Sequence, residues 1–597
     1  MKNKLYIPAL ALLSIAALSS CSDFLEAENK SSGGVTAEQY FNTPEGLTGL
    51  RSNAFHSLRA VVTSNAIYEN GTDLYWPSRN RGEDDFVRFS VNPENGDCQN
   101  LYVRAQEVAN NANSLIKYGG DTYKTDAIFL RSYAYYVMTQ QFGPVPYSTN
   151  YINDANRDYP RTPLKEIYDD CINELKGIYD TAPEKGNVND GTVNKRAIAA
   201  LIAKFNLAAA WDLETTLTDA QQGTYNITGT TYATEAAAWA EKAISGIALT
   251  QSFEQKWAPS NEDANPETFF SVQYQREGNP QSGTGHALQN DFGSYYGDIT
   301  TTFLKSATST KVPSLKSLYL WEKGDERYQG TFMTTFYNAP NANWGTEGYF
   351  AYYNASESEK AALPIAYYYA PYYVTRSEFE AFLTANAARF TTSPNAPFAY
   401  LMQNPVLVYS FNNGNWKLDS SKPYDYSTLS NSINFTPAVK KWDDPQTAQS
   451  NGSSVECYRD IILLHASESY LTAAEAYMLA GQEAKALEKI NAVRTRAKAK
   501  TLNAVSEYDP DYSYTGQMRM IDLVLDERAR ELYAENARYI DLRRTRQLVK
   551  YNVSYNNMIS SVADMMGQDG NIKWYRPIPT QELNNNTSEL MTQNPGY

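Results

Sequence analysis

Apolar residues recur at the spacing of one helix face in both ends of the chain, and this pattern limits the fold more than any other feature. Apolar residues three and four positions apart form one stripe on an α-helix, which must be buried against another element. The clearest stripe consists of Ile198, Leu201, Ile202, Phe205, Ala208 and Ala209. The pattern predicts helices over residues 101–118, 126–142, 164–179, 198–209, 232–247, 461–480 and 483–499.

The last two predicted helices meet at Gly481, and glycine readily takes the left-handed conformation that ends many helices. Small residues surround this junction, among them Ala473, Ala476 and Ala486. Small side chains let paired helices approach closely while larger ones fill the space between, as in tetratricopeptide repeats. A strict period of about 34 residues does not run through the chain. We therefore predict a mainly α fold of about four degenerate tetratricopeptide-like helix pairs, interrupted by a large loop-rich insertion region.

Residues 255–455 differ from both ends because they are rich in Gly, Pro, Asn, Ser and Tyr and show little helical periodicity. This composition favours long loops with short strands and a few helices. Loops held on a rigid scaffold carry a large share of binding residues, so we expect ligand binding here. The predicted organisation is a helical region at 21–254, the insertion at 255–455 and a second helical region at 456–597, in one integrated domain.

Residues 1–20 have the composition of a signal peptide. Lys2 and Lys4 precede an almost wholly apolar stretch over 5–18, and small residues follow before Cys21. The stretch is shorter than the roughly 20 residues that a transmembrane helix needs. This ending is typical of a bacterial lipoprotein, in which Cys21 becomes the lipidated N-terminus and anchors the protein without spanning the membrane. The alternative is an ordinary secretory peptide that happens to end near a cysteine.

The charge and hydropathy of the chain exclude several classes of protein. Lys and Arg number 52 against 67 Asp and Glu, so the net charge is −15, which disfavours binding to nucleic acid. The densest basic cluster, Arg494, Arg496, Lys498 and Lys500, is expected to be a solvated helix end. A mean hydropathy of −0.53 excludes a polytopic membrane protein.

Cysteine and histidine usage limits the chemistry further. Four cysteines in 597 residues exclude a disulfide scaffold, and Cys98, Cys171 and Cys457 are expected to be buried free thiols. With three histidines and without a phosphate-binding loop, HExxH or GxSxG, we predict neither an enzyme nor a cofactor. His465, three residues before Glu468, is expected to be packed rather than to bind a metal.

Two further chemical interpretations stay open. The oxygen-rich segment at residues 92–97 could hold a structural calcium ion, but its spacing departs from the known twelve-residue loop, and a plain turn is favoured. Counting acidic residues does not test for a pair of glycosidase carboxylates, because the required separation of about 5–9 Å is a property of the folded chain.

Aromatic rings in polar loops are the positive signal for function. Flat rings flanked by Asp, Asn and Arg suit a sugar, which offers apolar C–H faces for stacking and hydroxyl groups for hydrogen bonds. The alternative is that these rings only pin long loops to the scaffold. The predicted ligand-binding residues are Asp73, Trp76, Arg81, Tyr295, Tyr296 and Trp344.

Several segments, in order along the chain, match one family. They are Cys21-Ser22-Asp23-Phe24-Leu25, the helix at 127–135 followed by Phe142-Gly143-Pro144-Val145-Pro146, the stretch at 467–476 ("SExYLxxAEA"), the stretch at 526–544 ("ERxxELxxEGxRxxDLxR"), Pro577-Ile578-Pro579, and Gln593-Asn594-Pro595-Gly596-Tyr597. Together they resemble the SusD/RagB family of Bacteroidetes outer-membrane nutrient-binding lipoproteins. The acidic residues at 22–28 resemble the surface-export signal of such lipoproteins. His465 stands where the family more often has Arg, and Asn536 where it usually has Gly.

The resemblance implies a SusD-like superhelical scaffold and a role in polysaccharide utilization at the outer membrane. It implies capture of a glycan on the extracellular side and delivery to a SusC-like TonB-dependent transporter, over which the protein acts as a lid. The charged residues of the 526–544 stretch are expected to pair between helices rather than to contact ligand. Two alternatives remain: an oligopeptide ligand, as in the RagB branch, and a surface glycoside hydrolase.

Overall fold

The computed structural model describes most of the chain in eleven segments. They are residues 37–76, 84–275, 285–293, 310–337, 356–390, 398–400, 407–412, 415–418, 437–444, 456–509 and 518–597. The predicted signal peptide and the lipidation site at Cys21 lie outside these residues.

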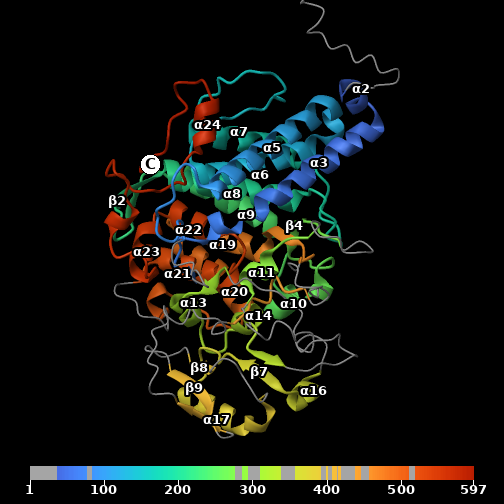
Figure 1. Cartoon of the computed structure of the whole chain (residues 1–597). Helices are drawn as coiled ribbons and strands as arrows, with labels where there is room; N and C mark the ends of the chain where they lie inside the picture. Colours follow the sequence, from blue (N-terminus) through green and yellow to red (C-terminus); the bar gives the residue numbers. More distant parts are fainter. Residues whose placement is uncertain are drawn as a thin grey trace, which may run out of the picture.

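Each long helix of the N-terminal half packs against the next helix along the chain. These helices form the upper part of the molecule in Figure 1. They are α3 (Pro44–Val62), α5 (Gly96–Gly119), α6 (Lys124–Phe142), α7 (Leu164–Tyr179), α8 (Lys195–Leu213) and α9 (Thr231–Ile244). Their inner faces supply most of the hydrophobic core, as the helical periodicity predicts.

The superhelix continues across the insertion. α19 (Ala466–Leu479) packs against α9, and α20 (Glu483–Arg496) packs against α19, although more than two hundred residues separate α9 from α19 in the sequence. The helices therefore form four successive pairs, α3 with α5, α6 with α7, α8 with α9, and α19 with α20. The predicted tetratricopeptide-like scaffold with a large insertion is confirmed.

All the predicted helices are found, with limits that differ by up to five residues, as at the start of α5. At the start of α19 the structure has a strand where the sequence pattern predicts a helix. Residues 461–465 form the strand β11 (Ile461–His465), which pairs antiparallel with β4 (Thr268–Val272). This run of branched and aliphatic side chains satisfies its backbone in a ladder, where such residues pack well. At the other end of α19, Gly481 has a φ of +70°, and Gln482 N donates to Tyr477 O at 2.8 Å. The predicted glycine helix end is confirmed.

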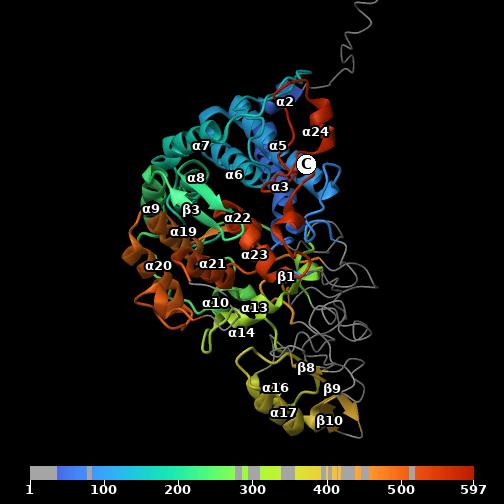
Figure 2. The same cartoon turned by 90° about the vertical axis from the view of Figure 1, so that its left-hand side faces the viewer.

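Within its described residues, the insertion consists of short helices and strands, as its composition predicts. Figures 1 and 2 both place its α16, α17 and β8–β10 at the end of the molecule opposite α24 (Thr580–Asn585). Its elements before β11 are α10 (Phe253–Lys256), β4, α11 (Leu288–Phe292), β5 (Val312–Pro313), α13 (Leu315–Tyr319), α14 (Arg327–Thr331), β6 (Thr335–Tyr337), α16 (Glu357–Ala362), β7 (Ile365–Tyr368), α17 (Arg376–Ala385), β8 (Phe398–Tyr400), β9 (Leu407–Asn412) and β10 (Asn415–Leu418).

Two predicted local features are found where expected, and a further contact fixes the chain end. The segment at 92–97 forms a turn, in which Asn95 Oδ1 accepts from Asp97 N and Cys98 N and so caps the start of α5. Cys98, Cys171 and Cys457 are buried free thiols. The chain end is tied down through Asn594, whose Nδ2 donates to Phe142 O at 2.9 Å and to Arg576 O at 2.8 Å.

Glu475 of α19, which lies in the stretch at 467–476, joins distant helices. Glu475 Oε1 accepts from Trp211 Nε1 of α8 at 2.7 Å, and Glu475 Oε2 lies 2.8 Å from Arg544 Nη2. Arg544 ends α22 (Arg538–Arg544), so one buried carboxylate links the N-terminal and C-terminal helices. The charged residues of these motifs are structural, as expected.

The helix α21 (Met520–Glu531) attaches the insertion to the scaffold through buried charges. Glu527 lies 2.6 Å from Arg327 of α14, 2.9 Å from Arg494 of α20 and 2.7 Å from Arg530 of its own helix. One turn later, Glu531 lies 3.1 Å from Lys256 of α10. Burial alone would raise the pKa of Glu531, but the surrounding cations outweigh it and hold the pKa well below its usual value.

The prediction of a solvated basic helix end is wrong for two of its four residues. Arg494 and Arg496 are buried, and Arg496 pairs with Glu267 at 3.2 Å and with Glu531. Lys498 and Lys500 are exposed. The two arginines are buried because ion pairs with acidic residues of α21 and the insertion offset the free-energy cost of removing their charges from water.

We predict that Glu531→Gln lowers the free energy of unfolding by about 3–5 kcal/mol, because it leaves buried cations without their carboxylate. The matched control is Glu326→Gln, which removes a partner of the exposed Lys498 and should cost about 0–1 kcal/mol. Urea unfolding followed by circular dichroism measures both variants. Equal, small losses in the two variants would contradict the role assigned to Glu531.

Candidate functional site

Two groups of predicted ligand-binding residues flank one short ladder. β1 (Tyr75–Trp76) pairs antiparallel with β5, with Tyr75 opposite Pro313 and Trp76 opposite Val312. Residues 77–83, which include Arg81, follow Trp76 directly, and residues 294–309, which include Tyr295 and Tyr296, end two residues before β5. The chain segments that carry these candidates therefore start and finish at neighbouring strands.

Asp73 fixes this ladder from inside the core. Its carboxylate accepts from Arg538 Nε and Nη2 at 2.7 Å each, and from Lys316 Nζ at 2.6 Å. Burial alone would raise the pKa of Asp73, but the charges of Arg538 and Lys316 hold it well below its usual value. Asp73 O also accepts from Ser314 Oγ at 2.6 Å.

These contacts correct the prediction that Asp73 binds ligand. Asp73 is fully buried, and both carboxylate oxygens serve cations from α13 and α22. Trp76 is 7% exposed at the end of β1, and its role in ligand binding stays a prediction. Asp73 holds the base from which the candidate segments leave.

The other predicted ligand-binding residues, Arg81, Tyr295, Tyr296 and Trp344, lie outside the described residues. Their role stays a prediction. Trp344 belongs to residues 338–355, which follow β6, and β6 pairs antiparallel with β7.

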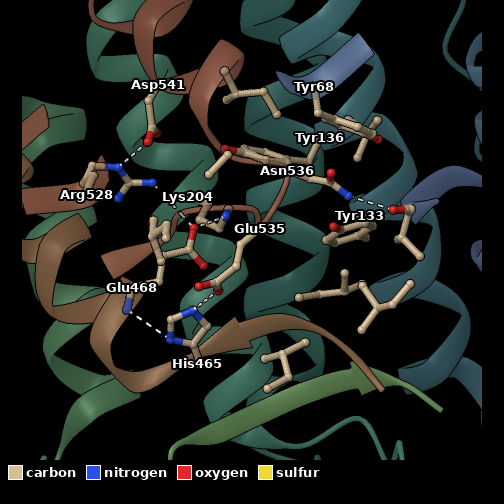
Figure 3. Close-up of a pocket in the computed structure, with 18 of the residues that line it drawn as sticks. Tyr68, Tyr133, Tyr136, Lys204, His465, Glu468, Arg528, Glu535, Asn536 and Asp541 are labelled. Carbon is tan, nitrogen blue, oxygen red and sulfur yellow. Dashed lines mark hydrogen bonds and ion pairs between the residues drawn. The ribbon is translucent and has the colours of Figure 1, made fainter. Parts of the chain in front are cut away.

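A small polar cavity lies where the N-terminal helices meet α19, α21 and α22 (Figure 3). Its volume is about 60 Å³, room for a few ordered water molecules. Lys204 of α8 pairs with Glu468 of α19, and Arg528 of α21 donates to Asp541 at 2.7 Å. Burial alone would raise the pKa of Glu468, but Lys204 and Arg528 lower it below its usual value.

His465 at the rim of this cavity is held on both ring nitrogens. Nδ1 accepts from Glu468 N at 3.3 Å and thereby caps α19, while Nε2 lies 3.0 Å from Glu535 Oε2 (Figure 3). Since a backbone N–H can only donate, Nδ1 is unprotonated and Nε2 carries the proton given to Glu535. The prediction of a packed histidine is confirmed.

Asn536 explains how the chain departs from the family pattern at this cavity. Its φ is +58°, a conformation that glycine adopts freely and that asparagine tolerates better than most residues. Its backbone N donates to Glu69 Oε1 at 2.7 Å, and its Nδ2 donates to Val62 O at 2.7 Å. The asparagine side chain thus adds a hydrogen bond to α3 that glycine could not make.

The charged residues of this cavity stabilise the fold. Each of its acidic side chains is paired with a cation or a histidine, and within the described segments no cluster of His, Cys, Asp or Glu is arranged to hold a metal ion. The partners Lys204 and Glu535 were missed in the sequence, because 264 and 70 residues separate them from Glu468 and His465. Spacing within one helix carries no signal for such pairs.

Two family models together match nearly every residue of the chain from residue 95 onwards. A model described as the SusD family matches residues 209–597, more than half of the 597 residues. A second model, described as starch-binding and associating with the outer membrane, matches residues 95–207. Among the described helices, none has the length and apolar character needed to cross a membrane.

Individual relatives are more distant. A SusD-like protein of Formosa agariphila is 22% identical over 336 residues, which cover 53% of this chain and 62% of that protein, so the chain spans less than two thirds of that relative. A SusD homolog from Bacteroides thetaiotaomicron has the same fold, with a TM-score of 0.64, 16% identity, and coverage of 94% of this chain and 98% of the other. A laminarin-binding SusD-like protein gives a TM-score of 0.58 at 16% identity, covering 93% and 99%.

We predict that Asp73→Asn destabilises the protein by about 3–5 kcal/mol, because Arg538 and Lys316 stay buried without their carboxylate. Asp85→Asn, at an exposed position close in sequence, should stay within about 0.5 kcal/mol of wild type. Chemical unfolding of both variants measures the difference. A stable Asp73→Asn protein would show that the ion pairs do not hold the β1–β5 ladder.

The pH dependence of stability offers a second test. Burial alone would raise the pKa of Glu535, but Lys441 and His465 lower it to about 2. A carboxylate with a lowered pKa stabilises the fold above its unfolded pKa, and this contribution is lost as the pH falls towards 2. Glu535→Gln should therefore be less stable than wild type at neutral pH, and the gap should close between about pH 4.5 and 2. In urea unfolding, the exposed Glu357→Gln should show no such gap.

Proposed function

The chain belongs to the SusD family, and from this premise we propose that it is a lipid-anchored outer-membrane protein that captures a glycan at the cell surface. The observation that carries the proposal is the match of residues 95–207 to a model described as starch-binding and associating with the outer membrane. The laminarin-binding SusD-like protein of the same fold supports the same class of ligand.

The β1–β5 ladder supports a location for the ligand. Segments that carry Arg81, Tyr295 and Tyr296 begin or end there, and the ladder is braced by buried ion pairs from Asp73. A rigid base lowers the entropy lost when residues attached to it bind a ligand. In this proposal Tyr295, Tyr296 and Trp344 stack on sugar rings, while Arg81 binds hydroxyl groups.

The mechanism is capture rather than catalysis. The helical scaffold faces a SusC-like TonB-dependent transporter, the protein acts as a hinged lid on it, and closure commits the bound glycan to the barrel. Cys21 carries the lipid that keeps the protein at the outer membrane, on the extracellular side. The net charge of −15 fits a neutral ligand better than a polyanion.

The two alternatives differ in what they require. An oligopeptide ligand needs backbone-pairing groups along a deep cleft, and a glycoside hydrolase needs two carboxyl groups at catalytic separation in a cleft. Burial and the nearby Glu262 raise the pKa of Asp460 to about 7. Asp460 is buried, and its carboxylate accepts from Tyr274 N at 2.9 Å. That carboxylate is engaged in holding β4 rather than placed for hydrolysis.

The first test uses soluble protein starting at Ser22 in affinity gels cast with a panel of polysaccharides, including starch and laminarin. The same mixtures are assayed for released sugars. Retardation by one glycan without product is the expected result. Released product would replace capture by hydrolysis, and retardation by no glycan together with binding of peptides would favour the oligopeptide alternative.

The second test asks which rings make the contact. We predict that Tyr295→Ala combined with Tyr296→Ala weakens glycan retention at least tenfold, about 1.4 kcal/mol, because sugar stacking is lost. Tyr40→Ala, at an exposed tyrosine of α2 (Ala37–Phe41), is the control and should retain full binding. Unchanged retention by the folded double variant would remove both tyrosines from the site.

A further inference from the structure

A second pocket lies in the helical scaffold, away from the insertion. It has a volume of about 500 Å³, within the range of small-molecule sites. α5 forms one wall, residues 146–159 form a second, and α24 with Met591 forms a third. Figure 2 shows α5 and α24 together at one end of the molecule, with β1 nearer the middle and α17 and β10 at the other end.

The walls of this pocket are held in place without a ligand. Asn110 of α5 makes two hydrogen bonds to the backbone of Ile152, donating to its O at 2.9 Å and accepting from its N at 2.8 Å. Asn586, just after α24, makes the same kind of pair with Tyr159, donating to its O at 2.7 Å and accepting from its N at 3.2 Å. The middle and the C-terminal end of the 146–159 wall are therefore tied to α5 and to the end of α24, which belong to distant parts of the sequence.

Tyr135 fixes the N-terminal part of that wall. Its hydroxyl group donates to Ser148 O at 3.2 Å and accepts from Ser148 N at 2.9 Å, and its ring meets the ring of Tyr147 edge-on at 4.6 Å between centroids. A pocket with walls fixed in this way binds without the entropic cost of ordering a loop.

Two other polar side chains of the pocket take no part in the hydrogen bonds that hold its walls. The side chains of Gln106 and Glu582 are half-buried and make no hydrogen bond to another described residue. Burial raises the pKa of the Glu582 carboxyl above its usual value. Partly desolvated amide and carboxylate groups gain most from a ligand that both donates and accepts.

The remaining lining restricts the kind of ligand. Tyr147, Tyr159 and Ile152 supply apolar and aromatic surface next to these polar groups. The lining carboxylates Glu107 and Glu582 are offset in part, because Glu107 pairs with Arg104 at 2.7 Å and Arg157 also lines the pocket. The pocket therefore has little net charge and suits a neutral ligand. Hydroxyl groups can donate to Glu582 and exchange both kinds of hydrogen bond with Gln106, while the C–H faces of a sugar ring cover tyrosine.

We infer that the pocket between α5, residues 146–159 and α24 binds a neutral oligosaccharide segment, as a second carbohydrate site separate from the loops that flank the β1–β5 ladder. The inference rests on the proposed capture of glycans and adds a second contact point to it. Two sites on one rigid body hold a polymer more tightly than either alone, since binding at the second becomes intramolecular.

The test is isothermal titration of the protein from Ser22 with maltohexaose and laminarihexaose. Val103→Trp places an indole in the pocket from a half-buried α5 position, and Glu582→Gln removes the charge while keeping the shape. Asn100→Trp, at an exposed position of the same helix, is the matched control. Wild type should bind two equivalents of one hexasaccharide. Val103→Trp should remove one of them, and Glu582→Gln should weaken that one about tenfold.

The outcomes separate this inference from the proposed function. One equivalent in wild type that the pocket variants leave unchanged, but the Tyr295 and Tyr296 double variant abolishes, overturns the second site and keeps glycan capture. Binding that only the pocket variants abolish supports the pocket and removes the loops. Binding of trilysine but of neither hexasaccharide would show that Glu582 serves a cationic peptide, and this would overturn the inference. Binding of none of the three probes would overturn it as well. Unfolding curves that match wild type establish that each variant is folded.

Discussion

The structure depends on buried carboxylates of α21 that bind cations from three other parts of the chain. Glu527 and Glu531 lie one turn apart and together meet arginines and a lysine from α10, α14 and α20. A buried ion pair gains little over an apolar contact of the same size, because both charges lose their hydration. Its value lies in geometry, since a misplaced insertion would leave several charges buried and uncompensated. The insertion is thereby held in one position on an otherwise repetitive scaffold.

The same principle operates at the candidate ligand region. Asp73 is far in sequence from Lys316 and Arg538, yet its carboxylate is the point where β1, α13 and α22 are joined. The residues that meet the ligand in the proposed function leave from this junction. Rigidity is supplied by the core, and variation of the loops can change the ligand without altering the scaffold. The pocket beside α24 is built differently, with its wall held by asparagine side chains that imitate a neighbouring strand.

The sequence predicts what depends on local order and misses what depends on long-range pairing. The helices of the scaffold follow from the spacing of residues such as Leu201 and Phe205, because a stripe on one helix is visible in one segment. Arg494 and Arg496 look like a solvated helix end until their acidic partners, up to 229 residues away, are known. Asp73 and Trp76 look like loop residues for the same reason, since the strand that pairs with β1 and the cations that pair with Asp73 lie more than two hundred residues further on. Family motifs corrected part of this gap, as they marked Glu527, Glu531 and Asp541 as structural charges.

The packing of α19 on α9 has a consequence for how the chain folds. α9 packs on α8 and on α19, so part of its surface is covered only when residues 466–479 arrive, after the entire insertion has been made. Contacts between such distant segments slow folding, because a long loop must close before they gain anything. The N-terminal helices therefore emerge first with an uncovered edge, which exposes them to wrong partners until the chain is complete. The superhelix is finished only when its last helix pair docks on α9.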